Sequence, residues 1–235
     1  MMAARETAVR LRLGRLVWTL LVTFYFLVFF RNFFADAAPD HNLTPTVLAY
    51  IFVLWLAVEY YLGSPFFQSG LVEASPLLRG VFAFFVYPFF GYLAADSIWW
   101  HWTQIPLPVW AVAPVGFLAF GAGTYLRLRA LYDIVRTNPS HPPNRRTQEP
   151  RVVNLPTQKL CRHPRYFATM LQLVGAALVF RSWGGLVLTA AIGLPLILLQ
   201  ARYEDNRLRK ALKQDARRYF EEVPFFWPGV GRSQT

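Results

Sequence analysis

The chain has 235 residues, of which 55% are hydrophobic and only 16% are charged, whereas soluble domains average about 45–50% and 25%. It contains 21 Phe and 8 Trp residues and carries a net charge of +11. This composition excludes an ordinary water-soluble domain, and a single cysteine, Cys161, excludes an internal disulfide. The basic residues are not interleaved with stacking aromatics on a soluble domain, so we expect no nucleic-acid partner.

Apolar windows that approach membrane-spanning length, roughly 17–25 residues, recur along the chain. They predict an all-α, polytopic integral membrane protein with about six membrane helices and a cytosolic amphipathic tail helix. The predicted spans cover about residues 16–34, 46–62, 81–95, 107–126, 166–180 and 186–201. The last two are short and flank 181-RSWGG-185, which predicts a C-terminal helical hairpin.

The predicted elements fall into two parts. Residues 1–106 hold the first three membrane helices, and residues 107–235 hold the fourth helix, a proline-rich cytosolic loop, the hairpin and the tail. In the tail, apolar residues recur at steps of three or four between Arg and Lys residues, namely Leu208, Leu212, Ala216, Tyr219 and Val223. This spacing predicts an amphipathic helix with a basic face from about residue 202 to 222.

Charge predicts the orientation. Four arginines precede the first span, nine Lys and Arg residues lie in segment 127–165, and the tail is basic, whereas segment 35–45 has two Asp and no Lys or Arg. By the positive-inside rule, both termini, the long loop and the tail are cytoplasmic in a membrane of the inner or plasma type, with membrane lipids as partners. Asp96, near a span end, is expected to reach toward the headgroups.

The densest polar cluster, 159-KLCRHPRYF-167, directly precedes the fifth span. Proline is favoured at the first helical position, so Pro164 is expected to start that helix and His163 to cap it. The free N–H groups of the helix start, together with Arg162 and Arg165, predict an anion-binding site.

Because a tight turn brings the outer ends of a hairpin together, residues of this cluster are expected near the end of the second arm. The expected neighbours are Arg162, His163 and Tyr166 on one side and Arg202, Glu204 and Asp205 on the other. Acids, arginines and a tyrosine at a membrane edge suit S-adenosylmethionine. Its carboxylate suits the helix start, its sulfonium suits an acid or an aromatic face, and its ribose hydroxyls suit a carboxylate.

The order of these motifs also carries a resemblance. "RHPRY", an apolar hairpin, "ARYEDNRL" and then "RRYFEEVP" resemble the membrane methyltransferase family that contains isoprenylcysteine carboxyl methyltransferases and phospholipid methyltransferases. The segment 120-FGAGTYLRLRA-130 is similar to the glycine-containing segment of that family and its downstream arginine. The resemblance covers about residues 120–224.

The resemblance implies an S-adenosylmethionine-dependent methyltransferase that acts on a lipidic or isoprenoid-type acceptor at the cytoplasmic membrane face. The cofactor-binding residues that it implies are Gly121, Gly123, Arg162, His163, Tyr166, Glu204 and Asp205. Arg202 and Glu204 are the candidate catalytic residues. Arg202 would hold a carboxylate acceptor, which needs no base, whereas an amine or phenol acceptor would need Glu204 or His163 as base.

The chain differs from the family pattern at three positions. Where the family usually has T-x-G-x-Y, this chain reads 154-NLPTQ-158, so that Pro156 replaces Gly and Gln158 replaces Tyr, and Asp205 replaces the second Glu. Two other functions stay open: a nicotinamide-dependent membrane reductase related to sterol reductases, and a non-catalytic lipid-binding pseudoenzyme.

Several residues also have plainer interpretations. In these interpretations, the arginines of the cluster are membrane anchors and His163 is only a helix cap. Gly121 and Gly123 are then ordinary small residues at a helix-packing surface. In the plainer interpretation, Asp205 pairs with Arg209 one turn later. An exposed pair of this kind contributes little to stability, so it explains poorly why acids occur in so basic a tail. Cys161 is expected to be an inert thiol. No pair of the four histidines has metal-ligand spacing, so we expect no metal site; the sequence leaves the oligomeric state open.

Overall fold

The computed structural model describes residues 75–137, 157, 160–212, 219–221 and 223–227, together with the single positions Val17, Phe24, Val47 and Ile51. The chain divides into two compact units, Met1–Pro65 and Phe66–Thr235. The first two predicted spans lie outside the described residues, apart from those four positions, which are helical and exposed. The described part of the second unit contains helices and no strand, which confirms the all-α prediction for this part of the chain.

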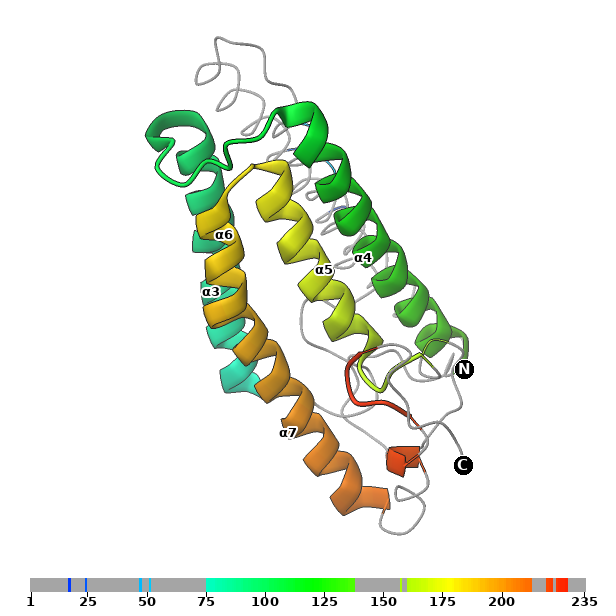
Figure 1. Ribbon diagram of the computed structural model, residues 1–235. Coiled ribbons are helices and arrows are strands. Elements are labelled where there is room, and N and C mark those ends of the chain that lie inside the picture. Colours follow the sequence, from blue (N-terminus) through cyan, green and yellow to red (C-terminus); the bar gives the residue numbers. More distant parts are fainter. Residues whose placement is uncertain are drawn as a thin grey trace. The chain divides into compact units, whose positions relative to one another are not determined.

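The helices of the second unit follow one another in a simple order. They are α3 (Pro76–Ala95), the π-helix η1 (Asp96–Trp100), α4 (Val109–Thr137), α5 (Pro164–Val179), α6 (Trp183–Leu188), the π-helix η3 (Thr189–Gly193) and α7 (Leu194–Leu212). In Figure 1, α5 lies between α4 on one side and the continuous column of α6 and α7 on the other, and α3 runs beside that column. The turn between α5 and α6 makes the predicted hairpin.

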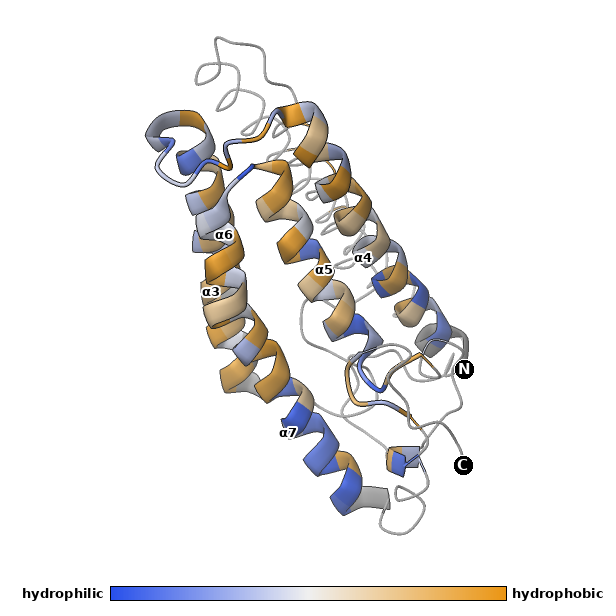
Figure 2. Cartoon of the chain, in the orientation of Figure 1, coloured by the Kyte–Doolittle hydropathy of each residue, from blue (hydrophilic) through white to orange (hydrophobic). Residues whose placement is uncertain are grey.

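Among the described residues, three helical stretches are long and apolar enough to cross a membrane: Gly80–Trp100, Val109–Asp133 and Trp183–Lys210. At about 1.5 Å per residue, each exceeds or matches the ~30 Å hydrocarbon core of a bilayer. The 16 residues of α5 reach only about 24 Å. Figure 2 shows hydrophobic residues along most of these helices, with hydrophilic residues at the C-terminal end of α7 and the start of α5.

Local sequence explains where the helices begin. Ser75 accepts a hydrogen bond from the Leu78 N–H, and Pro76 follows at the first helical position of α3. At the turn between α5 and α6, Arg181 adopts a left-handed φ of 54°, and the Ser182 hydroxyl accepts from the Gly185 N–H. These caps satisfy N–H groups that a helix start leaves without a partner.

The second arm of the hairpin is longer than the predicted range 186–201. It begins at Trp183, because Ser182 caps it there, and it continues without a break to Leu212. Segment 196–212 contains no Gly or Pro, so nothing ends the helix at the membrane boundary. The first part of the predicted tail helix is therefore the end of α7, and residues 213–218 and 222 lie outside the described residues.

Close backbone contact joins α4 to α5. A Cβ atom added to Gly175 would lie 2.5 Å from the Phe120 nitrogen and 2.7 Å from the Gly116 oxygen. A Cβ on Gly116 would likewise lie 2.7 Å from the Val179 nitrogen. Such spacing is typical of membrane helices that pack through small residues, and it fixes the position of α5 against the longer α4.

The expectation for Asp96 is wrong. Its side chain does not reach outward but is 0% exposed, at the end of the bundle opposite to the α7 C-terminus. The carboxylate accepts from the Thr103 N–H at 3.1 Å and from the Thr103 hydroxyl at 2.5 Å. That hydroxyl also bonds Tyr92 and Ser182, both at 2.8 Å. The network joins the connection between α3 and α4 to the hairpin turn. Its hydrogen bonds give the buried Asp96 carboxylate the partners that a buried polar group requires.

Candidate functional site at the start of α5 and the end of α7

The start of α5 has the predicted local structure. His163 is the N-cap, with φ of −122°, and Pro164 occupies the first helical position. The His163 carbonyl accepts from the N–H groups of Tyr166 and Phe167 at 3.1 and 3.0 Å. Its imidazole does not cap the helix, so the ring is available for other contacts.

The imidazole turns instead to two carboxylates of α7. Nε2 of His163 lies 2.8 Å from Oδ1 of Asp205, and Nδ1 lies 3.7 Å from Oε2 of Glu204. Both acids are buried, with 2% of Glu204 and 7% of Asp205 exposed. The start of α5, which the sequence predicted to bind an anion, thus lies next to two carboxylates of the protein itself. The positive end of a helix stabilises negative charge of this kind.

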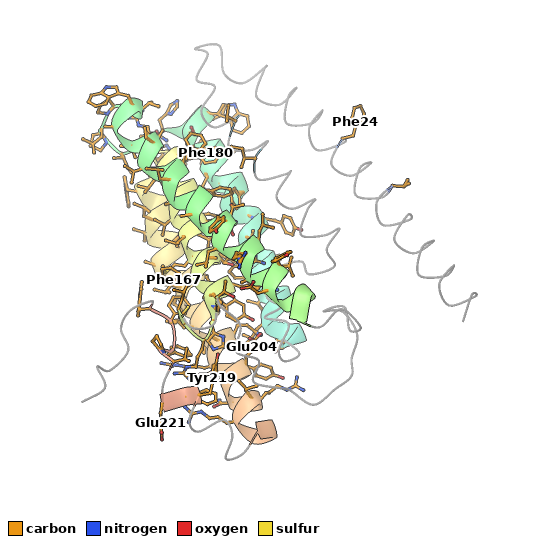
Figure 3. All side chains as sticks on the ribbon, turned by 90° about the vertical axis from the view of Figure 1, so that its right-hand side faces the viewer. Phe24, Phe167, Phe180, Glu204, Tyr219 and Glu221 are labelled. Atoms are coloured by element: carbon orange, nitrogen blue, oxygen red, sulfur yellow. The ribbon has the colours of Figure 1, made fainter. Side chains whose placement is uncertain are left out.

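Two further side chains of the α5 segment complete the cluster. The Arg162 guanidinium lies 2.5 Å from Oδ2 of Asp205, and the Tyr166 hydroxyl donates to Oε1 of Glu204. Arg162, His163 and Tyr166 therefore meet Glu204 and Asp205, which are some forty positions away in the sequence. The predicted convergence is observed for these five residues, which we call the α5–α7 cluster. Figure 3 shows Glu204 near the Phe167 end of α5, with Phe180 at the opposite end.

Arg202 and Gly121 do not join the α5–α7 cluster. Arg202 is exposed on α7 and has no partner among the described residues. Positions two apart on an α-helix differ by about 200° in direction, so Arg202 and Glu204 point to nearly opposite sides. Gly121 is exposed, and a Cβ added to it would meet no atom within 4 Å.

Gly123 belongs to the contact between α4 and α5. A Cβ on Gly123 would lie 2.6 Å from the Ala168 oxygen. Arg127, one turn further along α4, is buried and donates to the Thr169 hydroxyl at 2.5 Å and to the Arg165 carbonyl at 3.4 Å. The segment that resembles the family's glycine-containing segment therefore packs against the first turns of α5, next to the cluster.

Gln200 is a site residue that the sequence analysis missed. It is fully buried one turn before Glu204, and its amide nitrogen donates to Oε1 of Glu204 at 3.3 Å. Its own Oε1 has no hydrogen-bond partner among the described residues, and neither does Nδ1 of His163. A lone polar residue in the apolar run 194-LPLILLQA-201 was the available signal, since such residues inside membrane helices are usually functional.

Residues 219–221 and 223–227, near the C-terminus, cover the cluster from the polar end. The Pro224 carbonyl accepts from the Arg162 N–H at 2.9 Å, and the Phe225 ring stands edge-on to His163 at 5.5 Å. Phe220 lies between two guanidinium groups, 4.6 Å from that of Arg162 and 4.5 Å from that of Arg209. These cation–π contacts bind the segment to α7 and to the residues just before α5.

Burial changes the acid–base properties of three groups at this end of the protein. It lowers the pKa of Arg162, although the Asp205 carboxylate opposes the change. It raises the pKa of Tyr219, although the Arg162 charge opposes that rise. Burial also raises the pKa of the Cys161 thiol to about 11, despite a backbone hydrogen bond from His163 that lowers it. Desolvation is the main cause in each case, because low-dielectric surroundings disfavour the charged form.

The raised pKa of Cys161 gives a direct prediction. Maleimide dyes react with the thiolate, and a rise in pKa from 9.0 to about 11 leaves roughly 100-fold less thiolate at neutral pH. Labelling of the folded protein should therefore be at least that much slower than labelling of the denatured chain, and its rate should go on rising up to about pH 11. Because Cys161 is the single cysteine, a time course of dye incorporation measures this site alone. Equal rates for the folded and denatured chains would show that the thiol is open to solvent.

The loop that differs from the family pattern is described only at Thr157. This residue is buried, and its N–H donates to Oδ2 of Asp133 at 3.3 Å. Pro156 and Gln158 lie outside the described residues. In comparisons with known proteins, no family model, no curated protein and no solved structure matches this chain.

Proposed function

We propose that the protein is an S-adenosylmethionine-dependent membrane methyltransferase that transfers a methyl group to a lipidic or isoprenoid-type acceptor at the cytoplasmic membrane face. The observation that carries the proposal is the buried α5–α7 cluster, at one end of helices that are apolar enough to cross a membrane. The order of motifs that resembles the methyltransferase family supports it independently.

The charge of the cluster suits the cofactor. Glu204 and Asp205 bring two carboxylates to the cluster, and Asp205 is paired with Arg162. Carboxylate oxygens suit the sulfonium or the amino group of the cofactor, and they accept the hydroxyls of a ribose. The unsatisfied Oε1 of Gln200 is a further polar atom for a polar ligand. When bound, S-adenosylmethionine supplies an electrophilic methyl group, and the protein supplies alignment and a dry site.

The position of the site suits an acceptor from the bilayer. The helices that lead to the cluster consist mostly of hydrophobic residues, whereas the last turns of α7 are hydrophilic (Figure 2). These turns carry the exposed residues Arg207, Arg209 and Lys210. By the positive-inside rule, this basic end faces the cytoplasm. We therefore propose that the cofactor enters from the cytosol and the acceptor from the membrane.

One observation favours a non-catalytic alternative. Both carboxylates of the cluster already have protein partners, so the cluster can also be a structural clamp between α5 and α7. A pseudoenzyme that binds lipids without chemistry would have the same contacts. Ligand binding separates the two interpretations, because a clamp has no need of the cofactor.

The test is calorimetric binding of S-adenosylmethionine and of its demethylated product to the detergent-purified full chain. We expect micromolar affinity, reduced about 10- to 100-fold in Glu204→Gln, because a hydrogen bond to a charged group contributes about 1.5–3 kcal/mol. Asn206→Ala, an exposed neighbour on α7, is the matched control. If the folded wild-type protein binds neither compound, the methyltransferase proposal is wrong. Binding of a nicotinamide cofactor instead would support a reductase.

A further inference from the structure

Four side chains of the α5–α7 cluster that can hold or transfer a proton lie in a row. The row runs from the Tyr166 hydroxyl to Glu204, across 3.7 Å from Glu204 to Nδ1 of His163, and on to Asp205, which is paired with Arg162. Tyr166 is 1% exposed, and Glu204 and Asp205 are buried as well. A proton that reaches Glu204 would therefore have a second acceptor close by, in the His163 ring.

His163 has the orientation that this transfer requires. Asp205 lies 2.8 Å from Nε2, a contact that favours the tautomer in which Nε2 carries the proton and donates a hydrogen bond to that carboxylate. Nδ1 then carries a lone pair, faces Oε2 of Glu204 at 3.7 Å, and has no hydrogen-bond partner among the described residues. A carboxylate that fixes the tautomer of a histidine leaves the other ring nitrogen able to take a proton, and here that nitrogen faces Glu204.

By contrast, the cations nearest the cluster are already engaged by groups of the protein, as Arg209 is by the Phe220 ring, and a carboxylate acceptor would have to compete for them. Arg202 is exposed and points to nearly the opposite side of α7 from Glu204. Arg162 is bound to Asp205, and Arg127 is bound to Thr169 and to the Arg165 carbonyl. Arg165 also has a partner within the protein. A carboxylate acceptor would instead meet two buried carboxylates, and like charges in a buried site repel strongly.

We infer that the acceptor is a nucleophile that carries a proton, namely a hydroxyl, phenol or amine on an apolar body, and that Glu204 takes this proton. The inference rests on the proposed methyltransferase function. The bond between the acceptor atom and its hydrogen breaks, and the proton passes to Glu204 and on to Nδ1 of His163. The acceptor atom forms a bond to the methyl carbon, whose bond to sulfur breaks with the electron pair left on sulfur. His163 and Asp205 act through Glu204 and are positioning residues.

The experiment follows the label from methyl-labelled S-adenosylmethionine into a total membrane lipid extract, with the full-length protein in detergent. A methyl ester releases its label as methanol in alkali, whereas a methyl ether or a methylamine keeps it. We expect alkali-stable label in the lipid fraction. At saturating cofactor, Glu204→Gln should lower turnover about 10²- to 10⁴-fold, the usual effect of a general base.

A separate readout tests His163. In His163→Gln, turnover should fall more than tenfold while the calorimetric affinity for S-adenosylmethionine stays within a few-fold of wild type. The wild-type rate should rise with pH, because the base must be unprotonated, and this dependence should change in His163→Gln. The groups that face the imidazole are Glu204 and Asp205 from α7, Tyr166 from α5 and the uncharged Phe225 ring, with Arg162 on the far side of Asp205.

The outcomes separate the two proposals. Alkali-labile label, or a large loss of turnover in Arg202→Gln, would show a carboxylate acceptor and overturn this inference while the methyltransferase function stands. A turnover of His163→Gln within twofold of wild type would also overturn it. Absence of cofactor binding would refute the proposed function itself, and bound cofactor without label in any lipid would contradict both.

Discussion

Replacing Asp205 with alanine should lower the thermal unfolding midpoint of the detergent-purified protein by on the order of 10 °C. Asp205 lies 2.5 Å from Arg162 and 2.8 Å from His163, and all three side chains are largely buried. Loss of the acid leaves a buried guanidinium without its ion pair, and breaking a buried pair from one side costs about 3–5 kcal/mol. Labelling of Cys161, the residue next to Arg162, during heating reports this opening directly.

Two variants serve as controls for this prediction. Asp205→Asn keeps an acceptor oxygen for one partner, so it should lose less stability than Asp205→Ala. Asn206→Ala changes an exposed neighbour on the same helix and should shift the midpoint by about 2 °C at most. In a double-mutant cycle, Arg162→Met should cost less in the Asp205→Ala background than in the wild type. Equal midpoints for Asp205→Ala and Asn206→Ala would contradict the buried pairing.

The cluster combines a structural and a ligand-binding role in the same side chains. Glu204 and Asp205 hold the end of α7 against the start of α5, and they are also the groups that we propose to bind the cofactor. A variant that lacks activity is therefore informative only when its unfolding is measured alongside. For this reason Glu204→Gln, which keeps an acceptor for the Tyr166 hydroxyl, is a better test of binding than an alanine variant.

The sequence predicted the start of α5 and the convergence of its first residues with Glu204 and Asp205. The reason is local: Pro164 fixes the helix start, and the RSWGG turn returns the chain. The sequence did not predict which face of α7 meets α5. Arg202 and Glu204 are two positions apart and cannot both face one neighbour, and packing of α7 against α5 decides between them.

Other features depend on contacts between distant segments, which spacing along the chain does not reveal. Asp96 is buried because Thr103 and Ser182, from two different connections, come together around it. Residues 219–221 and 223–227 cover the cluster because Phe220 contacts Arg162, just before α5, and Arg209 on α7. Neither arrangement has a local sequence pattern, whereas Gln200 did have one, as a single amide in an apolar run.

Gly175→Ala should destabilise the protein by about 3 kcal/mol, because the added carbon would lie 2.5 Å from the Phe120 nitrogen and 2.7 Å from the Gly116 oxygen. Both atoms belong to the backbone, so no side-chain rotation relieves the contact, and α4 must move away from α5. The start of α5 moves with the helix, so the α5–α7 cluster should loosen as well. The expected readouts are a lower unfolding midpoint and faster labelling of Cys161 below that midpoint.

Gly121→Ala is the matched control on α4, since nothing lies within 4 Å of the added carbon. Alanine stabilises a helix interior by about 1 kcal/mol relative to glycine, so the midpoint should stay the same or rise. Gly123→Ala, with the Ala168 oxygen at 2.6 Å, should behave like Gly175→Ala. If Gly121→Ala weakens cofactor binding at unchanged stability, this glycine gives the cofactor access to α4, as the family resemblance implies. If Gly175→Ala is as stable as Gly121→Ala, the close contact between α4 and α5 is wrong.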